Sequence, residues 1–197
     1  MRHLIIPDTQ IKPEHPIDHM LWAGRYAAAI KPNTIIHLGD HWDFPSLSSY
    51  DVGKKSFEGR RYTADVEAGN EAMQVFMDCI KAEQSRMRRM KKKVWKPRLI
   101  FTLGNHEQRI ERAVESDAKL EGLMSYEDLN LRGWEVYPYL QPVIVDGIAY
   151  CHFFTSGVMA GQLLMQNYCS KRNICHASWD TYKTETLPLT ETRQEKE

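Results

Sequence analysis

Short apolar runs alternate with longer polar stretches along the first two thirds of the chain. Three of these runs are rich in Ile and Leu and end at Pro or Gly, which predicts buried strands at residues 4–6, 34–38 and 98–103. Residues 143–145 and 148–151 flank Asp146-Gly147, a dipeptide typical of tight hairpin turns. The pattern therefore predicts three separate strands followed by a β-hairpin.

Helical periodicity fills the intervals between the strands. Residues 16–30 predict a helix that ends at Pro32-Asn33, with a buried side formed by Ile17, Met20, Leu21 and Tyr26. Residues 62–93 predict one long helix with a buried stripe formed by Val66, Met73, Phe76, Met77 and Ile80. Two short helices are expected near 106–114 and 118–124. Strands alternating with helices, followed by a hairpin, indicate a layered α/β fold.

The composition is that of a globular protein and carries no global charge signal. The 197 residues are 42% hydrophobic and 26% charged, and 26 basic residues balance 26 acidic ones. No apolar run approaches the length of about 18 residues that a membrane-spanning helix needs. The first apolar segment is too short for a signal peptide, and the four unevenly spaced cysteines do not suggest a disulfide framework. We therefore expect a cytoplasmic protein without a membrane partner.

Polar side chains that can bind metal follow each predicted strand. They are Asp8 and Gln10, then Asp40 and Asp43, then Asn105, His106 and Glu107, and finally His152 after the hairpin. Ligands of layered α/β proteins gather at the carboxyl ends of strands, so these residues are expected to converge. Carboxylate, amide and imidazole groups together suit Mn²⁺, Mg²⁺, Fe²⁺ or Zn²⁺. Gly39 and Gly104 would let the backbone turn sharply just before these residues.

The order of these motifs resembles that of the calcineurin-like metallophosphoesterases. The chain has Asp-x-Gln, Gly-Asp-x-x-Asp, Gly-Asn-His-Glu and His, where the family has Asp-x-His, Gly-Asp-x-x-Asp, Gly-Asn-His-Asp/Glu, His and Gly-His-x-His. The likeness runs from residue 4 to about 155, and residues 39–46 look most like bacteriophage members. It implies a four-layer α/β/β/α sandwich and metal-dependent hydrolysis of phosphoesters, by a phosphatase or phosphodiesterase, in the cytoplasm of a bacterial host if the protein is phage-encoded.

The resemblance also implies a dinuclear metal site. Asp40 would bridge two divalent ions, Asp8 and Gln10 would bind the first ion, and Asn105 and His152 the second. The ions would acidify a bridging water that attacks phosphorus. Gln10 stands where the family has His, and its amide oxygen is a harder and weaker ligand than imidazole. This difference favours Mn²⁺, or Mg²⁺, over Zn²⁺.

Three further residues receive catalytic roles from the resemblance. His106 would act at the phosphate, Glu107 would orient His106, and Arg109 would hold a phosphate oxygen. Asp43 is expected to support its loop and not to bind metal. The loop of residues 41–60 is long enough to suggest function. Within it His41 either touches substrate or lies on the surface, and the aromatic rings of Trp42, Phe44 and Tyr50 either stack on a base or pack internally.

A dense basic cluster lies at the end of the long predicted helix. It comprises Arg86, Arg88, Arg89, Lys91, Lys92 and Lys93, with Lys96 and Arg98 close behind. One interpretation is a solvated helix end that complements the helix dipole. The other is a contact to the phosphate backbone of a nucleic acid, which would make the protein a nuclease acting on DNA or RNA.

The C-terminal segment departs from the family, because no Gly-His-x-His motif occurs in it. The sequence thus divides into a metallophosphoesterase domain at 1–159 and an atypical tail at 160–197. If one base were lost after codon 159, the codons of Trp179 and Asp180 would force Gly in the other frame, followed by residues compatible with His-x-Gln. The fold would then lack its last helix and strand. The alternatives are that codon degeneracy permits this string by chance, and that the chain is an inactive remnant or a non-catalytic nucleic-acid-binding module.

Overall fold

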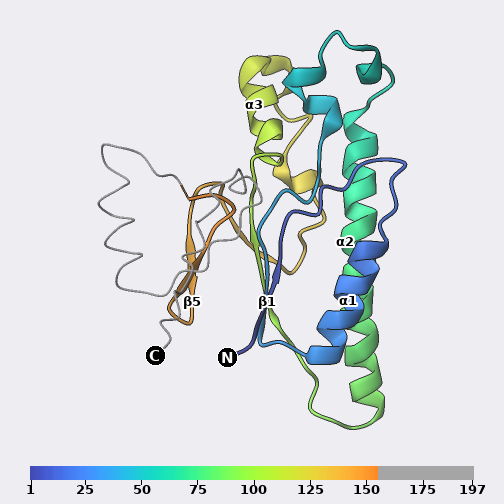
Figure 1. The fold of residues 1–197 in the computed structure, drawn as a ribbon, viewed down its shortest axis with the longest axis vertical. Helices are drawn as coiled ribbons and strands as arrows, with labels where there is room; N and C mark the ends of the chain where they lie inside the picture. The colour runs from blue at the N-terminus through green and yellow to red at the C-terminus, as the bar shows by residue number, and fades with distance from the viewer. Residues whose placement is uncertain (155–197) are drawn as a thin grey trace, which may run out of the picture.

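A four-stranded parallel sheet forms the centre of the computed structural model, which describes residues 1–154 (Figure 1). Its strands follow chain order, as β1 (His3–Ile6), β2 (Thr34–His37), β3 (Arg98–Thr102) and β4 (Glu135–Tyr137). The three separate strands predicted from the sequence are confirmed. The short strand β4 was not predicted, because two of its three residues are exposed and it carries no apolar run.

Helices connect the successive strands, and the two longest cover one face of the sheet (Figure 1). They are α1 (Asp18–Ile30) and α2 (Tyr62–Arg89), and the shorter α3 (Gln108–Ser116) precedes β4. Met73, Phe76 and Ile80 of α2 are buried in the core as predicted. Tyr26 was wrongly placed on the buried side of α1, because 57% of its surface is exposed. The predicted helix at 118–124 is only a 3₁₀ turn, η4 (Ala118–Leu120).

The predicted hairpin is present and packs against the opposite side of β2 and β3. Strands β5 (Val143–Val145) and β6 (Ile148–Tyr150) pair antiparallel, and Asp146 and Gly147 both have positive φ angles, as a tight hairpin turn requires. A second core joins the hairpin to the sheet through Ile36, Leu38, Ile100, Val143, Val145 and Tyr150. The structure thus confirms a layered α/β fold.

The long loop between β2 and α2 folds into three 3₁₀ turns, η1 (Pro45–Leu47), η2 (Ser49–Asp51) and η3 (Lys55–Phe57). Trp42 and Phe44 are fully buried, so these two rings pack internally, whereas Tyr50 is 83% exposed. No helix in the described part of the chain is long and apolar enough to cross a membrane. The predicted domain end at residue 159 and the tail at 160–197 lie outside the described residues.

Candidate metal centre

Four of the five expected metal ligands come together beyond the carboxyl ends of β1, β2 and β3. His152 lies at the middle of the group. Its Nε2 is 2.9 Å from Oδ1 of Asn105 and 3.4 Å from Oδ2 of Asp40, and its Nδ1 is 3.7 Å from Oδ1 of Asp8. Parallel strands bring these loops to one edge of the sheet. The hairpin adds His152 from the other side, immediately after β6.

Backbone and side-chain contacts orient the ring of His152. Its Nδ1 carries a hydrogen, because it lies 2.7 Å from the carbonyl oxygen of Leu38, which can only accept. Its Nε2 faces the amide oxygen of Asn105 and a carboxylate oxygen of Asp40, both of which are acceptors. When Nε2 carries no hydrogen, its lone pair and these two oxygens form a set of three donors to a metal ion. Such a donor set fits a cation.

Gln10 is the fifth expected ligand. Its side chain is exposed and makes no hydrogen bond to any residue of 1–154. Its backbone N–H donates to the carbonyl oxygen of Asp40 at 2.9 Å, which joins the loop after β1 to the loop after β2. The described structure thus gives Gln10 a backbone role and leaves its ligand role as a prediction.

The backbone around Asp40 is strained and tightly packed. Asp40 has a φ of 49° and is 3% exposed, and Gly39 before it has a φ of 88°. The sharp turn predicted at Gly39 is therefore present. Gly104 is needed for a different reason: a Cβ at this position would overlap Oδ1 of Asp40. Gly39 meets both requirements, since a Cβ there would lie 2.5 Å from the backbone nitrogen of Gly104, whereas Gly104 has no positive φ and meets only the close approach.

Glu107 holds the ligand-bearing loops and does not touch the ring of His106. Its fully buried carboxylate accepts hydrogen bonds from the backbone N–H groups of Asp40, His41, Trp42 and Gly104, at 2.7–3.2 Å. Burial and the charge of Asp40 raise the pKa of Glu107 to about 7, against the lowering effect of these hydrogen bonds. The expected orienting contact from Glu107 to His106 is thus replaced by a contact to the backbone.

Asp43 supplies the contact to His106 that was expected of Glu107. Nδ1 of His106 lies 2.9 Å from Oδ1 and 2.9 Å from the carbonyl oxygen of Asp43, so Nδ1 carries a hydrogen. Its Nε2 lies 3.7 Å from Oδ2 of Asp40. Burial lowers the pKa of His106, but the hydrogen bond to Asp43 and the charge of Asp40 outweigh it, so the pKa is raised.

Arg109 is tied to the protein more closely than its expected phosphate-binding role implies. Nη1 donates to the carbonyl oxygens of Asp43 and Phe44 at 2.6 and 3.2 Å, and Nη2 lies 3.1 Å from Nε2 of His106. Because the guanidinium is partly used by these contacts, Arg109 positions His106 and the loop after β2.

Beneath the site lies a buried histidine pair that the sequence did not predict. Nε2 of His37 lies 3.3 Å from the hydroxyl of Thr9, which lies 2.7 Å from Nδ1 of His41. Nε2–H of His41 donates to the carbonyl oxygen of Gly69 at 2.9 Å, and burial lowers the pKa of His41 to about 4. Since His41 is fully buried, it is neither a surface residue nor exposed to a substrate. A loop histidine next to Asp40 gave no signal of this burial.

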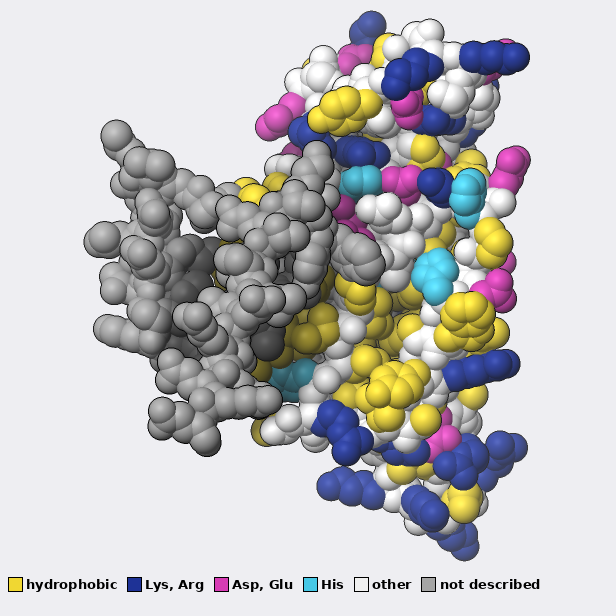
Figure 2. All heavy atoms as spheres, viewed as in Figure 1, with side chains coloured by type: hydrophobic (Ala, Val, Ile, Leu, Met, Phe, Trp, Pro, Cys, Tyr) yellow, Lys and Arg dark blue, Asp and Glu magenta, His cyan; other side chains and the backbone are white. Residues whose placement is uncertain are grey.

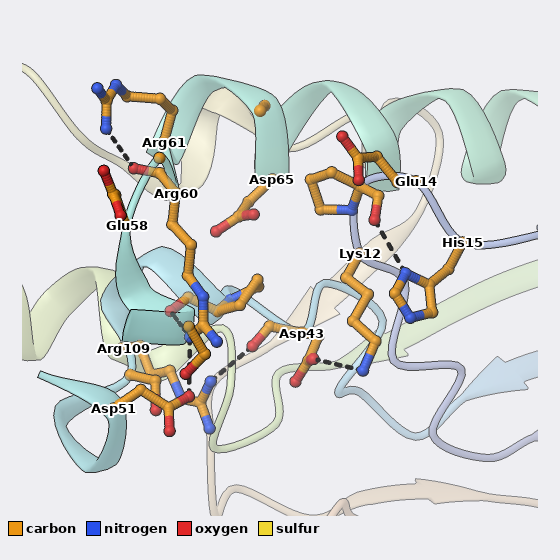
Figure 3. A pocket seen from close by; sticks show the side chains of 16 residues that line it. Lys12, Glu14, His15, Asp43, Asp51, Glu58, Arg60, Arg61, Asp65 and Arg109 are labelled. Carbon is orange, nitrogen blue, oxygen red and sulfur yellow. Dashed lines mark hydrogen bonds and ion pairs between the residues drawn. The ribbon is translucent and has the colours of Figure 1, made fainter. Parts of the chain in front are cut away.

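Two hollows share Arg109 as a lining residue. The first has a volume of about 700 Å³ and is lined by charged groups of both signs, among them Lys12, Asp43, Arg60 and Asp65 (Figure 3). The second, of about 480 Å³, lies between α3 and residues 46–57 and reaches Asn105. Both volumes suit small organic ligands.

The comparisons with known proteins identify no relative: no family model, curated protein or solved structure matches the chain. Within residues 1–154, no group of three or more His, Cys, Asp or Glu side chains has metal-binding geometry. The candidate donor set therefore depends on the amide of Asn105 as well as on Asp8, Asp40 and His152.

Proposed function

We propose that this chain hydrolyses phosphoesters with divalent metal ions held by Asp8, Asp40, Asn105 and His152. The observation that carries the proposal is the meeting of three atoms that can ligate a metal, Nε2 of His152, Oδ1 of Asn105 and Oδ2 of Asp40, at the carboxyl edge of a parallel sheet. Three of these four ligands bind through oxygen, which suits Mn²⁺ or Mg²⁺, and the amide oxygen predicted from Gln10 would add to that preference. The arrangement of motifs agrees with the resemblance to calcineurin-like metallophosphoesterases.

Bound ions would polarise the phosphoryl oxygens and activate water as a nucleophile. The residues of the chain do the remaining work. His106 faces the site with Nε2, while its Nδ1–H is held by Asp43, so Nε2 is the atom that can stabilise the phosphate or hold a proton for the leaving oxygen. Glu107 keeps the loops of Asp40 and Gly104 at a fixed separation, which preorganises the ligands.

The same proposal includes the four-layer sandwich. Its support is the position of two cores on opposite sides of the parallel sheet: one lies under α1 and α2, and the other lies between the sheet and the β5–β6 hairpin. A second sheet facing the first is the arrangement that would bring a hairpin histidine to the carboxyl edge of β2.

The test is hydrolysis of p-nitrophenyl phosphate and bis(p-nitrophenyl) phosphate by the full chain with Mn²⁺. We expect Asp40→Asn and His106→Ala to lower kcat/KM by about 100-fold or more, as loss of a metal ligand or a general acid does. Asp78→Asn is the matched control, since Asp78 is exposed on α2, away from the site. Activity within twofold of wild type in both site variants would contradict the assignment. Mn²⁺ binding without cleavage of any ester would favour the non-catalytic module.

A second candidate function is binding of a polyanion at the far end of α2. Figure 2 shows basic side chains gathered at this end of the molecule. No ion pair to a described residue involves Arg88, Arg89, Lys91, Lys92, Lys93 or Lys96, whereas Arg86 is paired with Glu83. Six unpaired cations in one place favour a polyanion such as DNA or RNA. The residues next to Asp40 contact α2 at Gly69, about five helical turns before the cluster. This separation favours nucleic-acid binding over a nuclease that holds its substrate at the cleavage site.

A further inference from the structure

The smaller hollow next to the candidate metal centre has an unusual lining. Its walls are α3 on one side and residues 46–57 on the other, and Asn105 lies at one end. Two arginines, Arg109 and Arg112, line it, and no Asp or Glu does. The larger hollow of Figure 3 instead has five acidic and four basic lining residues. Of the two, the smaller hollow is therefore the one whose charge suits an anionic substrate.

Arg112 is the cation in this hollow that is available to a ligand. Its Nη2 donates to the carbonyl oxygen of Asn105 at 3.0 Å, which places the guanidinium beside a proposed metal ligand. Its remaining N–H groups make no hydrogen bond within residues 1–154, and the side chain is exposed. Arg109 differs, because its guanidinium already contacts two carbonyl oxygens and His106. A planar guanidinium with free donors suits a phosphate oxygen pair.

The opposite wall of the hollow carries large apolar side chains beside three serines. Tyr50 and Val52 are 83% and 68% exposed, and with Phe57 they line the side that faces α3. Exposed large apolar side chains in one pocket are typical of ligand contacts. Tyr50 and Phe57 line the same hollow as the guanidinium of Arg112. An aromatic ring and a cation in one hollow fit a molecule with an anionic end and a planar ring.

We propose that the substrate of this chain is a phosphoester of an alcohol that carries a planar aromatic ring, such as a nucleoside, bound in the hollow between α3 and residues 46–57. The inference rests on the proposed function. Arg112 binds the phosphate next to Asn105, and Tyr50 stacks on the ring of the esterified group. In the reaction the water oxygen forms a new bond to phosphorus, the bond from phosphorus to the ester oxygen breaks, and the alcohol leaves with a proton.

The test uses the full chain with Mn²⁺ and compares two phosphate esters, one whose alcohol carries an aromatic ring and one whose alcohol does not. Phosphate release is measured from adenosine monophosphate and from glycerol phosphate. We expect wild type to prefer the aromatic ester by about tenfold in kcat/KM, which is the size of one stacking contact. Tyr50→Ala should abolish this preference through KM, whereas Tyr26→Ala, an exposed tyrosine on α1, should retain it. Equal use of the two esters by wild type, or an equal effect of Tyr50→Ala on both, would overturn the proposal.

Arg112 is tested in parallel. Arg112→Ala should raise KM for both esters by about tenfold with kcat little changed, because one charge-assisted contact is lost. Arg112→Lys should recover part of the loss, and Arg132→Ala, an exposed arginine outside the hollow, should have no effect. If wild type cleaves neither ester, the proposed function fails. Calorimetric binding of adenosine monophosphate that is weakened by Tyr50→Ala and Arg112→Ala would then still support the hollow as a binding site, and no binding would overturn it.

Discussion

Four backbone N–H groups on two different loops share the carboxylate of Glu107, and this one side chain fixes the distance between the loops. Glutamine at this position has one acceptor oxygen, and its amide hydrogens would face N–H donors. We therefore expect Glu107→Gln to lower the free energy of unfolding by about 2–4 kcal/mol, since buried donors lose a charged acceptor. Urea unfolding measures the change.

The control for this change is Glu115→Gln. Glu115 is exposed on α3, the helix that begins directly after Glu107. It should alter stability by less than about 0.5 kcal/mol. A Glu107→Gln protein as stable as the control would show that the backbone contacts of Glu107 contribute little.

At the residue scale, the sequence was a good guide to which side chains lie close together. It was a poorer guide to the contact that each side chain makes. Asp8, Asp40 and Asn105 each follow a strand of the parallel sheet, so their meeting follows from topology. The exchange of roles between Glu107 and Asp43 does not, because it depends on how the loops after β2 and β3 pack together. Side-chain type and spacing do not determine that packing.

At the element scale, the apolar pattern predicted α1, α2 and the strands β1, β2 and β3 because each has a buried face. Strand β4 was not predicted because two of its three residues are exposed. Tyr26 shows the reverse error: its helical spacing matched the stripe of α1, but its ring faces outward. Periodicity thus identifies an element more reliably than it assigns a single aromatic residue to a face.

An ion-pair group holds the C-terminal end of α1 against α2. Glu83 of α2 contacts Arg86 of the same helix and Lys31, the capping residue of α1, at 2.7 and 2.9 Å. Hydrogen bonds from Arg86 and Lys31 lower the pKa of Glu83 to about 2. A carboxyl with a pKa lower in the folded than in the unfolded state stabilises the fold above the unfolded pKa. That contribution is lost as the pH falls toward the folded pKa.

We expect Glu83→Gln to destabilise the protein at pH 7 by about 0.5–1 kcal/mol, a modest value because solvent reaches the pair. The difference from wild type should shrink as the pH falls from about 4.5, the unfolded range of a glutamate, toward 2. Urea unfolding at pH 7, 5, 4 and 3 gives the profile, and Glu67→Gln, exposed on the same helix, is the control. A difference that does not change with pH would contradict the ion-pair explanation.

At the scale of the whole molecule, a net charge of zero conceals a separation of charge. The 28 residues of α2 span about 42 Å at 1.5 Å per residue. The helix begins beside the long loop near the candidate metal centre and ends in the basic cluster (Figures 1 and 2). Global composition averages over this distance, so it cannot reveal that one end of the molecule is positively charged.

The basic end should act independently of the site. Replacing Arg88, Lys92 and Lys93 with glutamine removes three cations that form no ion pair within the described residues. If these residues contact phosphates, the dependence of the logarithm of DNA affinity on the logarithm of salt concentration should become shallower by up to about 2.7, at roughly 0.9 per lost contact. Hydrolysis of p-nitrophenyl phosphate should stay unchanged, because the loop of Asp40 contacts α2 at Gly69, about five helical turns before the cluster. Fluorescence anisotropy of labelled DNA between about 50 and 300 mM salt measures the slope. The matched control replaces Lys55, Lys119 and Arg132, which are exposed elsewhere. An equal change of slope in both triple variants would mean that the polyanion responds to total charge and not to the end of α2.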